Sequence, residues 1–255
     1  MMDSSWSIKQ IKEYIDSNEW SDEIKLKLQK DTRKGVQKLI KFYEKQAEIK
    51  KKLSQHFKEL STFEQAQWLK GKRYVAGVDE AGRGPLAGPV VAAAVILPQD
   101  FYLLGLDDSK KLNKQTRERY FEYIVENAIA YQTGIIEPVE IDQINIYQAT
   151  KQAMRTALEN IPVKPDHVLI DAVELEDLPY TSDSIIKGDQ KSISIAAASI
   201  IAKVTRDRLM TEYHQQFPQY QFEKNSGYGT QHHIEAIHQF GITAIHRKSF
   251  LKNIM

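Results

Sequence analysis

The sequence predicts an α/β fold for its larger, carboxyl-terminal part and a helical extension in front of it. In the larger part, apolar runs of strand length alternate with longer stretches of helical spacing, which is the pattern of a sheet covered by helices. The extension shows helical spacing, and no internal repeat is evident in the chain. We therefore divide the 255 residues into a basic helical extension, residues 1–72, and an α/β domain, residues 73–255.

The extension has apolar residues at helical spacing in two stretches, and Ser7 is a suitable N-cap for the first. We expect two or three helices here. The recurring positions are Ile8, Ile11 and Ile15, then Val36, Leu39, Ile40 and Tyr43.

Charge is distributed unevenly along the chain. Residues 1–73 hold 17 basic and 11 acidic residues, a net charge of +6, whereas residues 74–255 hold 18 and 23, a net charge of −5. The lysines of the extension, including Lys50, Lys51 and Lys52, suit sequence-independent contact with nucleic-acid phosphates. A solvated helical face that keeps the protein soluble accounts for them equally well.

The α/β domain is expected to begin with two strands. The second is a run of valine, alanine, isoleucine and leucine with proline at both ends. Strand-like runs and helical patterns then alternate along the chain. Strands are expected at 74–78, 90–97, 131–136 and 167–170, and helices at 116–128, 145–160 and 192–217.

Two acidic residues follow the first of these strands. Asp79 and Glu80 precede the loop Gly82-Arg83-Gly84. Adjacent strand residues point to opposite faces, so the two carboxylates share one site only if the chain bends, which the glycines permit. Close carboxylates repel each other unless a proton or a cation intervenes. A hard cation such as Mg²⁺ or Mn²⁺ suits their oxygens, and the chain has no cysteine.

Other interpretations of this segment are open on the pattern alone. Asp79 and Glu80 could be turn residues, with the glycines making a tight loop. A dinucleotide-binding motif fits less well, because the glycine spacing differs, a strand follows, and the acidic pair repels a pyrophosphate. No P-loop sequence occurs in the chain.

The segment from Asp79 resembles the opening motif of the ribonuclease HII family, and further blocks follow in the family's order. Ribonuclease HIII, a related family, typically has lysine where this chain has Arg83. The resemblance covers residues 74–250 and says nothing about residues 1–72. Seven blocks carry it: Asp-Glu-Ala-Gly-Arg-Gly-Pro-Leu-Ala-Gly-Pro-Val from Asp79, Leu-Asp-Asp-Ser-Lys-Lys-Leu from Leu106, Leu-Ile-Asp from Leu169, Lys-Gly-Asp from Lys187, Ala-Ala-Ala-Ser-Ile-Ile-Ala-Lys-Val-Thr-Arg-Asp from Ala196, Gly-Tyr-Gly-Thr from Gly227 and His-Arg-Lys-Ser-Phe from His246.

This resemblance implies a ribonuclease H-like fold, with a mixed central sheet flanked by helices and a smaller helical carboxyl-terminal portion. It implies an endonuclease that cuts 5′ to a ribonucleotide, in RNA/DNA hybrids and at single ribonucleotides in duplex DNA, leaving 5′-phosphate and 3′-hydroxyl ends. Two divalent cations, Mg²⁺ or Mn²⁺, would act together on the phosphodiester. The implied catalytic and metal-binding residues are Asp79, Glu80, Asp171 and Asp189.

Asp171 ends its strand as Asp79 ends its own, so two neighbouring strands would bring them together. Alone, an aspartate there is more often a cap or turn residue than a ligand. For the fourth carboxylate, Asp189 and Asp207 compete on sequence grounds. Motif matching favours Asp189, because Asp207 lies in the long helix beside two arginines, where an ion pair is the simpler account.

Substrate-binding residues also follow from the resemblance. Only the 2′-hydroxyl separates RNA from DNA at one nucleotide. The loop Gly82, Arg83 and Gly84 would contact it, and Tyr228 would stack on the neighbouring deoxyribose. Without the resemblance, Tyr228 would be taken for an aromatic packed in a loop. Backbone phosphate is expected at Ser109, Lys110 and Lys111, and also at Arg247 and Lys248 if the carboxyl-terminal tail folds back.

The spacing of the histidines and the overall composition argue against several other classes of protein. His232, His233 and His238 lack the His-Glu-x-x-His spacing of a zinc site, so we expect mostly exposed helix residues. Without cysteine there is no disulfide framework. The amino terminus lacks the features of a secretory signal, and the uncharged runs are shorter than the roughly 20 residues of a membrane helix. We expect a cytoplasmic monomer that binds RNA/DNA hybrids and ribonucleotide-containing duplex DNA, not membranes.

Two alternative functions stay open. One is a ribonuclease HIII-like nuclease restricted to hybrids. The other is a different ribonuclease H-fold protein that processes or binds nucleic acid. The intact acidic residues argue against a silent binder, and the ordered blocks argue against a resolvase-like or integrase-like enzyme.

Overall fold

The computed structural model describes residues 6–252 and 254. Its contacts divide the chain into two compact units between Lys58 and Glu59. The boundary predicted after residue 72 stays a prediction. Each unit is described by itself.

The first unit is a small helical bundle. It contains α1 (Ile8–Asn18), α2 (Asp22–Leu28) and most of α3 (Lys34–Leu60). Ser7 caps α1 as predicted, in a capping box with Gln10 in which the Gln10 N–H donates to Ser7 Oγ over 3.3 Å. The buried core consists of Ile11, Ile15, Ile24, Leu28, Val36 and Ile40.

The second unit is built on a mixed five-stranded sheet with the order β3-β2-β1-β4-β5. β1 pairs antiparallel with β2 and parallel with β4, and β4 pairs parallel with β5. Sequence analysis missed β5, because its Thr-Ser-Asp-Ser stretch is polar and exposed and is held through its backbone at the sheet edge. The strands are β1 (Val75–Ala81), β2 (Val90–Ile96), β3 (Ala130–Ile136), β4 (His167–Asp171) and β5 (Thr181–Ile185).

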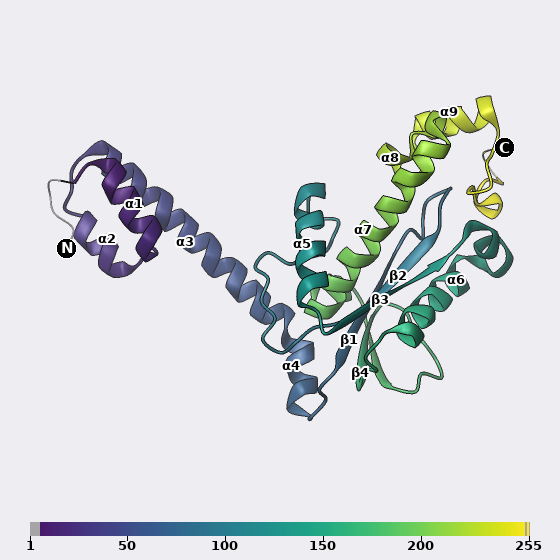
Figure 1. The fold of residues 1–255 in the computed structure, drawn as a ribbon, viewed down its shortest axis with the longest axis horizontal. Helices are drawn as coiled ribbons and strands as arrows, with labels where there is room; N and C mark the ends of the chain where they lie inside the picture. The colour runs from purple at the N-terminus through teal and green to yellow at the C-terminus, as the bar shows by residue number, and fades with distance from the viewer. Residues whose placement is uncertain (1–5, 253, 255) are drawn as a thin grey trace. The chain divides into compact units, whose positions relative to one another are not determined.

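Helices cover both faces of this sheet (Figure 1). α6 packs on β2 and β3, and α7 packs on β1 and β2. Further helices lie before β1, between β2 and β3, and after α7. The helices are α4 (Thr62–Leu69), α5 (Lys114–Asn127), α6 (Pro138–Asn160), α7 (Ile193–Gln216), α8 (Phe222–Asn225) and α9 (Gln231–Phe240).

The predicted start of one helix at residue 145 marks a break inside α6. Asn145 has φ 68° and ψ 163°, and its side chain accepts hydrogen bonds from the N–H groups of Tyr147 and Gln148. Asn145 therefore caps the second half of α6. The preceding turns, from Pro138 onward, were not predicted.

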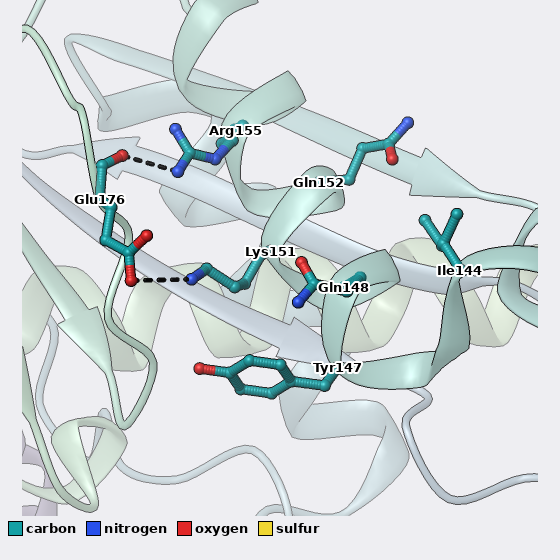
Figure 2. A pocket seen from close by; sticks show the side chains of 7 residues that line it. All are labelled: Ile144, Tyr147, Gln148, Lys151, Gln152, Arg155 and Glu176. Carbon is teal, nitrogen blue, oxygen red and sulfur yellow. Dashed lines mark hydrogen bonds and ion pairs between the residues drawn. The ribbon is translucent and has the colours of Figure 1, made fainter.

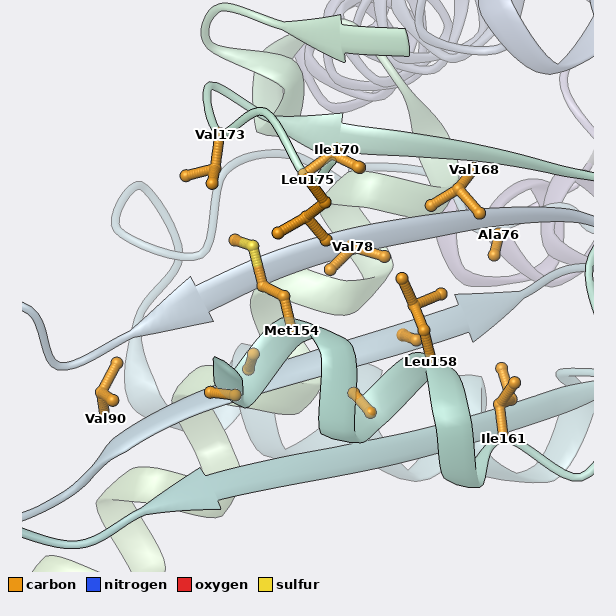
Figure 3. Packing of buried hydrophobic residues seen from close by; sticks show 14 of the residues in the cluster. Ala76, Val78, Val90, Met154, Leu158, Ile161, Val168, Ile170, Val173 and Leu175 are labelled. Atoms are coloured by element: carbon orange, nitrogen blue, oxygen red, sulfur yellow. The ribbon is translucent and has the colours of Figure 1, made fainter. Parts of the chain in front are cut away.

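The core between the sheet and α6 is made mostly of small and branched side chains (Figure 3). Ala76 and Val78 of β1 point to this side, toward Met154 and Leu158 of α6. On the other face, a Cβ on Gly77 would lie 2.0 Å from the carbonyl carbon of Ser194 in α7. The absence of a side chain at Gly77 therefore lets α7 lie directly on β1.

β1 extends further than the sequence predicted. Its expected end at Val78 is wrong, because Asp79 and Glu80 pair with Ala93 and Ala92 of β2 and the strand continues to Ala81. On its other side, the pairing of β1 with β4 stops at Val78. The acidic pair thus lies inside β1, where its neighbour β4 is ending.

Candidate active site

The acidic side chains gather at the end of β1 and β4. Val78 pairs with Ile170 in parallel register, so the next residues along the two strands, Asp79 and Asp171, stand side by side as expected. Asp189 comes from the short 3-10 turn Gly188–Gln190 before α7. The Gly188 N–H donates to Asp171 Oδ1 over 2.6 Å, which joins this turn to β4.

Burial and mutual repulsion disfavour the charged forms of these groups. Burial raises the pKa of Asp79 well above its usual value, and the charges of Glu80 and Asp171 add to this. Burial also raises the pKa of Asp171 and of Glu80, although the Arg83 guanidinium opposes the shift at Glu80. The pKa of Asp189 rises to about 6 through burial and through the nearby Asp108 and Asp171. A cation among these groups would relieve the repulsion.

Asp108 is a further acidic residue here that sequence analysis did not single out. It is 6% exposed, and its Oδ1 accepts from the Lys110 N–H over 2.9 Å. Burial disfavours charge on Lys110, but Asp108, Asp79 and Asp189 outweigh it and raise the Lys110 pKa. Asp108 lies in the block from Leu106 that resembles the ribonuclease HII family. It follows no predicted strand, however, so its place in the sequence did not mark it as a candidate site residue.

One pocket of about 350 Å³ brings the predicted substrate-binding residues together with Glu80. Tyr228 is 49% exposed there, and a Cβ on Gly84 would come within 3.6 Å of its ring. The hydroxyl of Ser109 lies 2.9 Å from that of Ser199, and its contact with substrate stays a prediction. The lining residues are Glu80, Ala81, Gly82, Arg83, Gly84, Ser109, Lys110, Ser199, Lys203, Arg206 and Tyr228.

The glycine-rich loop is held by a buried arginine. Arg247 is 0% exposed and donates from Nη2 to the Gly82 carbonyl (2.6 Å), from Nη1 to the Arg83 carbonyl (3.0 Å) and from Nε to the Gly88 carbonyl (2.9 Å). Burial lowers its pKa to about 9. The predicted phosphate contact of Arg247 is therefore wrong, because its guanidinium N–H groups are buried and donate to carbonyls of the loop.

Arg206 of α7 holds the same region from the other side. It is 1% exposed and donates to the carbonyls of Pro89, Ala87 and Ser226 over 2.9 to 3.1 Å. Gly82 has φ +96°, and a Cβ there would lie 2.1 Å from Arg206 Nε. Gly82 is thus required by its backbone conformation and by this close approach.

The histidines of the carboxyl-terminal portion support the loop that carries Tyr228. His232 and His238 are exposed as expected, but His233 is buried, so that expectation is wrong for it. The Thr243 N–H donates to His246 Nδ1, and His246 Nε2 lies 3.1 Å from His233 Nε2. His233 Nδ1 then donates to the Tyr228 carbonyl over 2.8 Å.

The two candidates for the fourth carboxylate lie in different environments. Asp207 forms ion pairs with Lys203 of the same helix at 2.7 Å and with Arg117 at 3.8 Å, so its predicted ion-pair role is confirmed. Asp189 is 5% exposed and lies close enough to Asp171 for their charges to interact. Of the two, Asp189 belongs to the acidic cluster.

The acidic residues suit a divalent cation by the chemistry of their donors. Their oxygens are hard ligands of the kind that Mg²⁺ and Mn²⁺ take. Glu80 Oε2 is buried without a hydrogen-bond partner among the described residues. Within the same residues, no three acidic or histidine side chains form a ready-made coordination site. The fit therefore rests on the donor set and on the unpartnered Glu80 oxygen.

A larger surface groove beside α6 lacks such a donor set (Figure 2). It has a volume of about 660 Å³. The basic side chains of the groove contact Glu176. The Glu176 carbonyl accepts from Arg155 over 2.6 Å, and the Glu176 carboxylate lies 3.8 Å from Lys151 Nζ. The acidic cluster at β1 and β4 is thus the better candidate for catalysis.

Comparison with known proteins points to one family. The family model for ribonuclease HII matches residues 76–253, and the model for the ribonuclease HII N-terminal domain matches residues 7–68. A ribonuclease HII of Bacillus cereus (strain G9842) is 56% identical over 233 residues, 91% of this chain and 90% of that protein. One of Enterococcus faecalis is 54% identical over 245 residues, 96% of each chain.

Solved structures confirm the predicted ribonuclease H-like fold. Ribonuclease H2 from Pyrococcus horikoshii OT3 is 28% identical with a TM-score of 0.59, over 69% of this chain and 93% of that one. Bst-RNase HIII, solved in complex with Mn²⁺, has a TM-score of 0.57 over 69% of this chain and 67% of that one, and at 20% identity it supports the fold alone. No helix among residues 6–252 is both long and apolar enough to cross a membrane. Since the family models and relatives of more than half identity account for nearly the whole chain, this protein belongs to the ribonuclease HII family and is a metal-dependent ribonuclease H.

Proposed function

We propose that this ribonuclease H cuts the phosphodiester 5′ to a ribonucleotide, both in RNA/DNA hybrids and at a single ribonucleotide within duplex DNA. One observation carries the proposal: Glu80 of the acidic cluster shares a pocket with the Gly82–Gly84 loop and with Tyr228. A pocket that joins cleavage groups to a sugar-recognising loop can select the bond beside one ribose. A cytoplasmic location and a monomeric state stay predictions.

In this proposal Asp79, Glu80, Asp171 and Asp189 hold two cations, Mg²⁺ or Mn²⁺. When bound, such cations would lower the pKa of a bound water and would place positive charge at the leaving 3′ oxygen. Hydrolysis of the bond between phosphorus and that oxygen yields 5′-phosphate and 3′-hydroxyl ends. The four carboxylates provide negative charge from fixed positions on β1, β4 and the Gly188–Gln190 turn. Lys110 stands beside them and can bind the phosphate that carries the bond to be cut.

Recognition of the ribose would fall to the loop and to Tyr228. Arg247 already occupies the carbonyls of Gly82 and Arg83, so the loop offers N–H donors, to which a 2′-hydroxyl oxygen can bind. The half-exposed ring of Tyr228 can stack on the next sugar, where a 2′-hydroxyl would crowd it. This pair would favour a junction from RNA to DNA.

The test is cleavage of end-labelled duplexes with Mg²⁺, with Mn²⁺ and with a chelator. Three substrates of one length are compared: a DNA duplex with one ribonucleotide, an RNA/DNA hybrid and an all-DNA duplex. We expect a metal-dependent nick 5′ to the single ribonucleotide, cutting of the hybrid and an intact all-DNA duplex. Cleavage of the hybrid alone would indicate ribonuclease HIII-like specificity. Tight binding without any cleavage would refute the proposed catalysis.

A further inference from the structure

α3 carries a row of lysines on one face, which we name the lysine stripe: Lys34, Lys38, Lys41 and Lys45. Their spacing of four, three and four residues places them along one side of an α-helix. All four side chains are exposed. Val36 and Ile40 lie on the opposite side of α3 and are buried in the core of the first unit. The stripe therefore points away from the packed face of its own helix.

The stripe lysines differ from several other lysines of this unit, which are paired with carboxylates. Among the described residues, none of the four stripe lysines has a carboxylate within ion-pair distance. By contrast, Lys50 pairs with Glu19 at 3.4 Å and Lys52 with Glu48 at 2.8 Å. The run from Lys50 to Lys52, which the sequence suggested as the phosphate contact, is thus partly neutralised.

The length of the stripe suits a nucleic-acid backbone. From Lys34 to Lys45 the helix rises about 16 Å, a length over which one strand of DNA carries about five phosphates. Two exposed apolar residues, Phe42 and Ile49, flank the stripe. They are too few to insert α3 into a membrane surface, since its broad apolar face is already used in packing.

Charge distribution favours the same partner. The catalytic part, residues 74–255, has a net charge of −5 and presents clustered carboxylates, so its overall charge does not attract a polyanion. Residues 1–73 carry the surplus of +6. The surplus of positive charge that can attract a phosphate backbone at long range therefore lies in this amino-terminal part.

We propose that the lysine stripe binds the phosphate backbone of duplex nucleic acid without sequence preference and thereby supplies much of the electrostatic affinity of the enzyme. The proposal rests on the proposed function only in taking the cleaved duplex as the partner. It assigns the surface to a role in binding, not in the choice of the cut.

The test compares two full-length variants with the same loss of charge. The stripe variant combines Lys34→Gln, Lys38→Gln, Lys41→Gln and Lys45→Gln. The control variant combines Lys9→Gln, Lys27→Gln, Lys50→Gln and Lys52→Gln, in which every lysine replaced has a carboxylate partner. Glutamine keeps helix propensity, and far-ultraviolet circular dichroism checks that both variants are folded.

Binding is measured in chelator, on an all-DNA duplex and on a duplex with one ribonucleotide. The salt concentration is varied from about 50 to about 300 mM, a range over which phosphate contacts change the affinity strongly. Each lost phosphate contact lowers the slope of log K against log salt by about 0.9, so the stripe variant should lose about 2 to 4 from its slope and the control variant less than about 1. With metal added, the position of the nick should stay the same in both variants.

Equal slopes in the two variants would overturn the proposal, because net charge alone would then explain the effect. Loss of binding to vesicles of anionic lipid with an unchanged duplex slope would assign the stripe to a membrane and overturn it as well. Failure of the wild-type protein to nick at a ribonucleotide would refute the proposed function, yet the slopes on all-DNA duplex would still judge the stripe.

Discussion

Replacing Asp189 with asparagine should stabilise the metal-free protein, and the gain should grow with pH. Burial, followed by the charges of Asp108 and Asp171, raises the Asp189 pKa to about 6 from a usual value of 3.8. The folded protein therefore holds this proton more tightly than the unfolded chain does. The resulting stability is fully present below about pH 4 and is lost as the pH rises through about 6. Asparagine has no proton to lose, so Asp189→Asn escapes this loss.

The size of the effect follows from the pKa difference. A shift of about 2 pKa units corresponds to about 3 kcal/mol between the two protonation states, which is an upper limit. Screening by solvent and relaxation of the carboxylates reduce it, so we expect a gain on the order of 1 to 2 kcal/mol at pH 8. For a domain of this size, that corresponds to a rise in Tm of roughly 2 to 8 °C.

The assay is unfolding by urea in chelator at several values between pH 5 and pH 8. The difference in unfolding free energy between Asp189→Asn and the wild-type protein should increase up to about pH 7 and then level off. Asp207→Asn serves as the control, because Asp207 is already paired with Lys203 and should yield no gain at high pH. A difference that is constant from pH 5 to pH 8 would refute the reasoning. Added Mn²⁺ should reverse the order, since the wild-type carboxylate then has a cation to bind.

Three other changes test the site and its support. Asp79→Asn or Asp171→Asn should abolish cleavage in the nicking assay and raise metal-free stability by on the order of 1 kcal/mol, and normal turnover would remove that residue from the site. Arg247→Lys removes the fork that holds three loop carbonyls, so kcat should fall at least about tenfold at a temperature where the variant is folded. Arg208→Lys, at an exposed arginine paired with Glu118, should leave kcat unchanged, and equal losses in both variants would contradict the role of Arg247. Truncation of residues 1–58 should retain a folded catalytic unit, whereas truncation of residues 1–70 should lower its Tm by several degrees, because it removes the buried Glu64 that accepts from the Ser194 N–H over 3.0 Å. Equal Tm values for the two truncations would show that α4 is dispensable.

Much of the fold could be predicted because burial imposes simple patterns. β2 is covered by helices on both faces, so its run from Val90 to Ile96 is apolar throughout and easy to recognise. α7 lies between the sheet and other helices and carries an equally clear apolar pattern. β5 has neither property, since four of its five residues are exposed and only backbone pairing with β4 defines it. The end of β1 was missed for a related reason: pairing with β2, not local sequence, carries the strand through Asp79 and Glu80.

Within the site, sequence could nominate the residues that would meet the substrate but not those that hold them. Asp79 and Asp171 each follow a recognisable strand, and register then places them side by side. Arg247 is distant in the chain from the Gly82–Gly84 loop, and its motif resembles a phosphate contact because arginine is the usual residue for that task. Only the tertiary structure shows that the guanidinium N–H groups of Arg247 donate to backbone carbonyls.

The buried cations have a consequence for how specificity is built. Arg206 and Arg247 lie buried and donate to backbone carbonyls, so their charge is stabilised by aligned backbone dipoles. Such an arrangement loses several hydrogen bonds at once if the loop shifts, which makes the loop conformation sharply defined. In the proposed recognition of the ribose, this loop distinguishes one 2′-hydroxyl from its absence, and an error of about 1 Å in position can lower a rate a hundredfold. We therefore expect the hydrogen bonds from Arg247 to matter to the proposed recognition of the ribose as much as the loop's own atoms do.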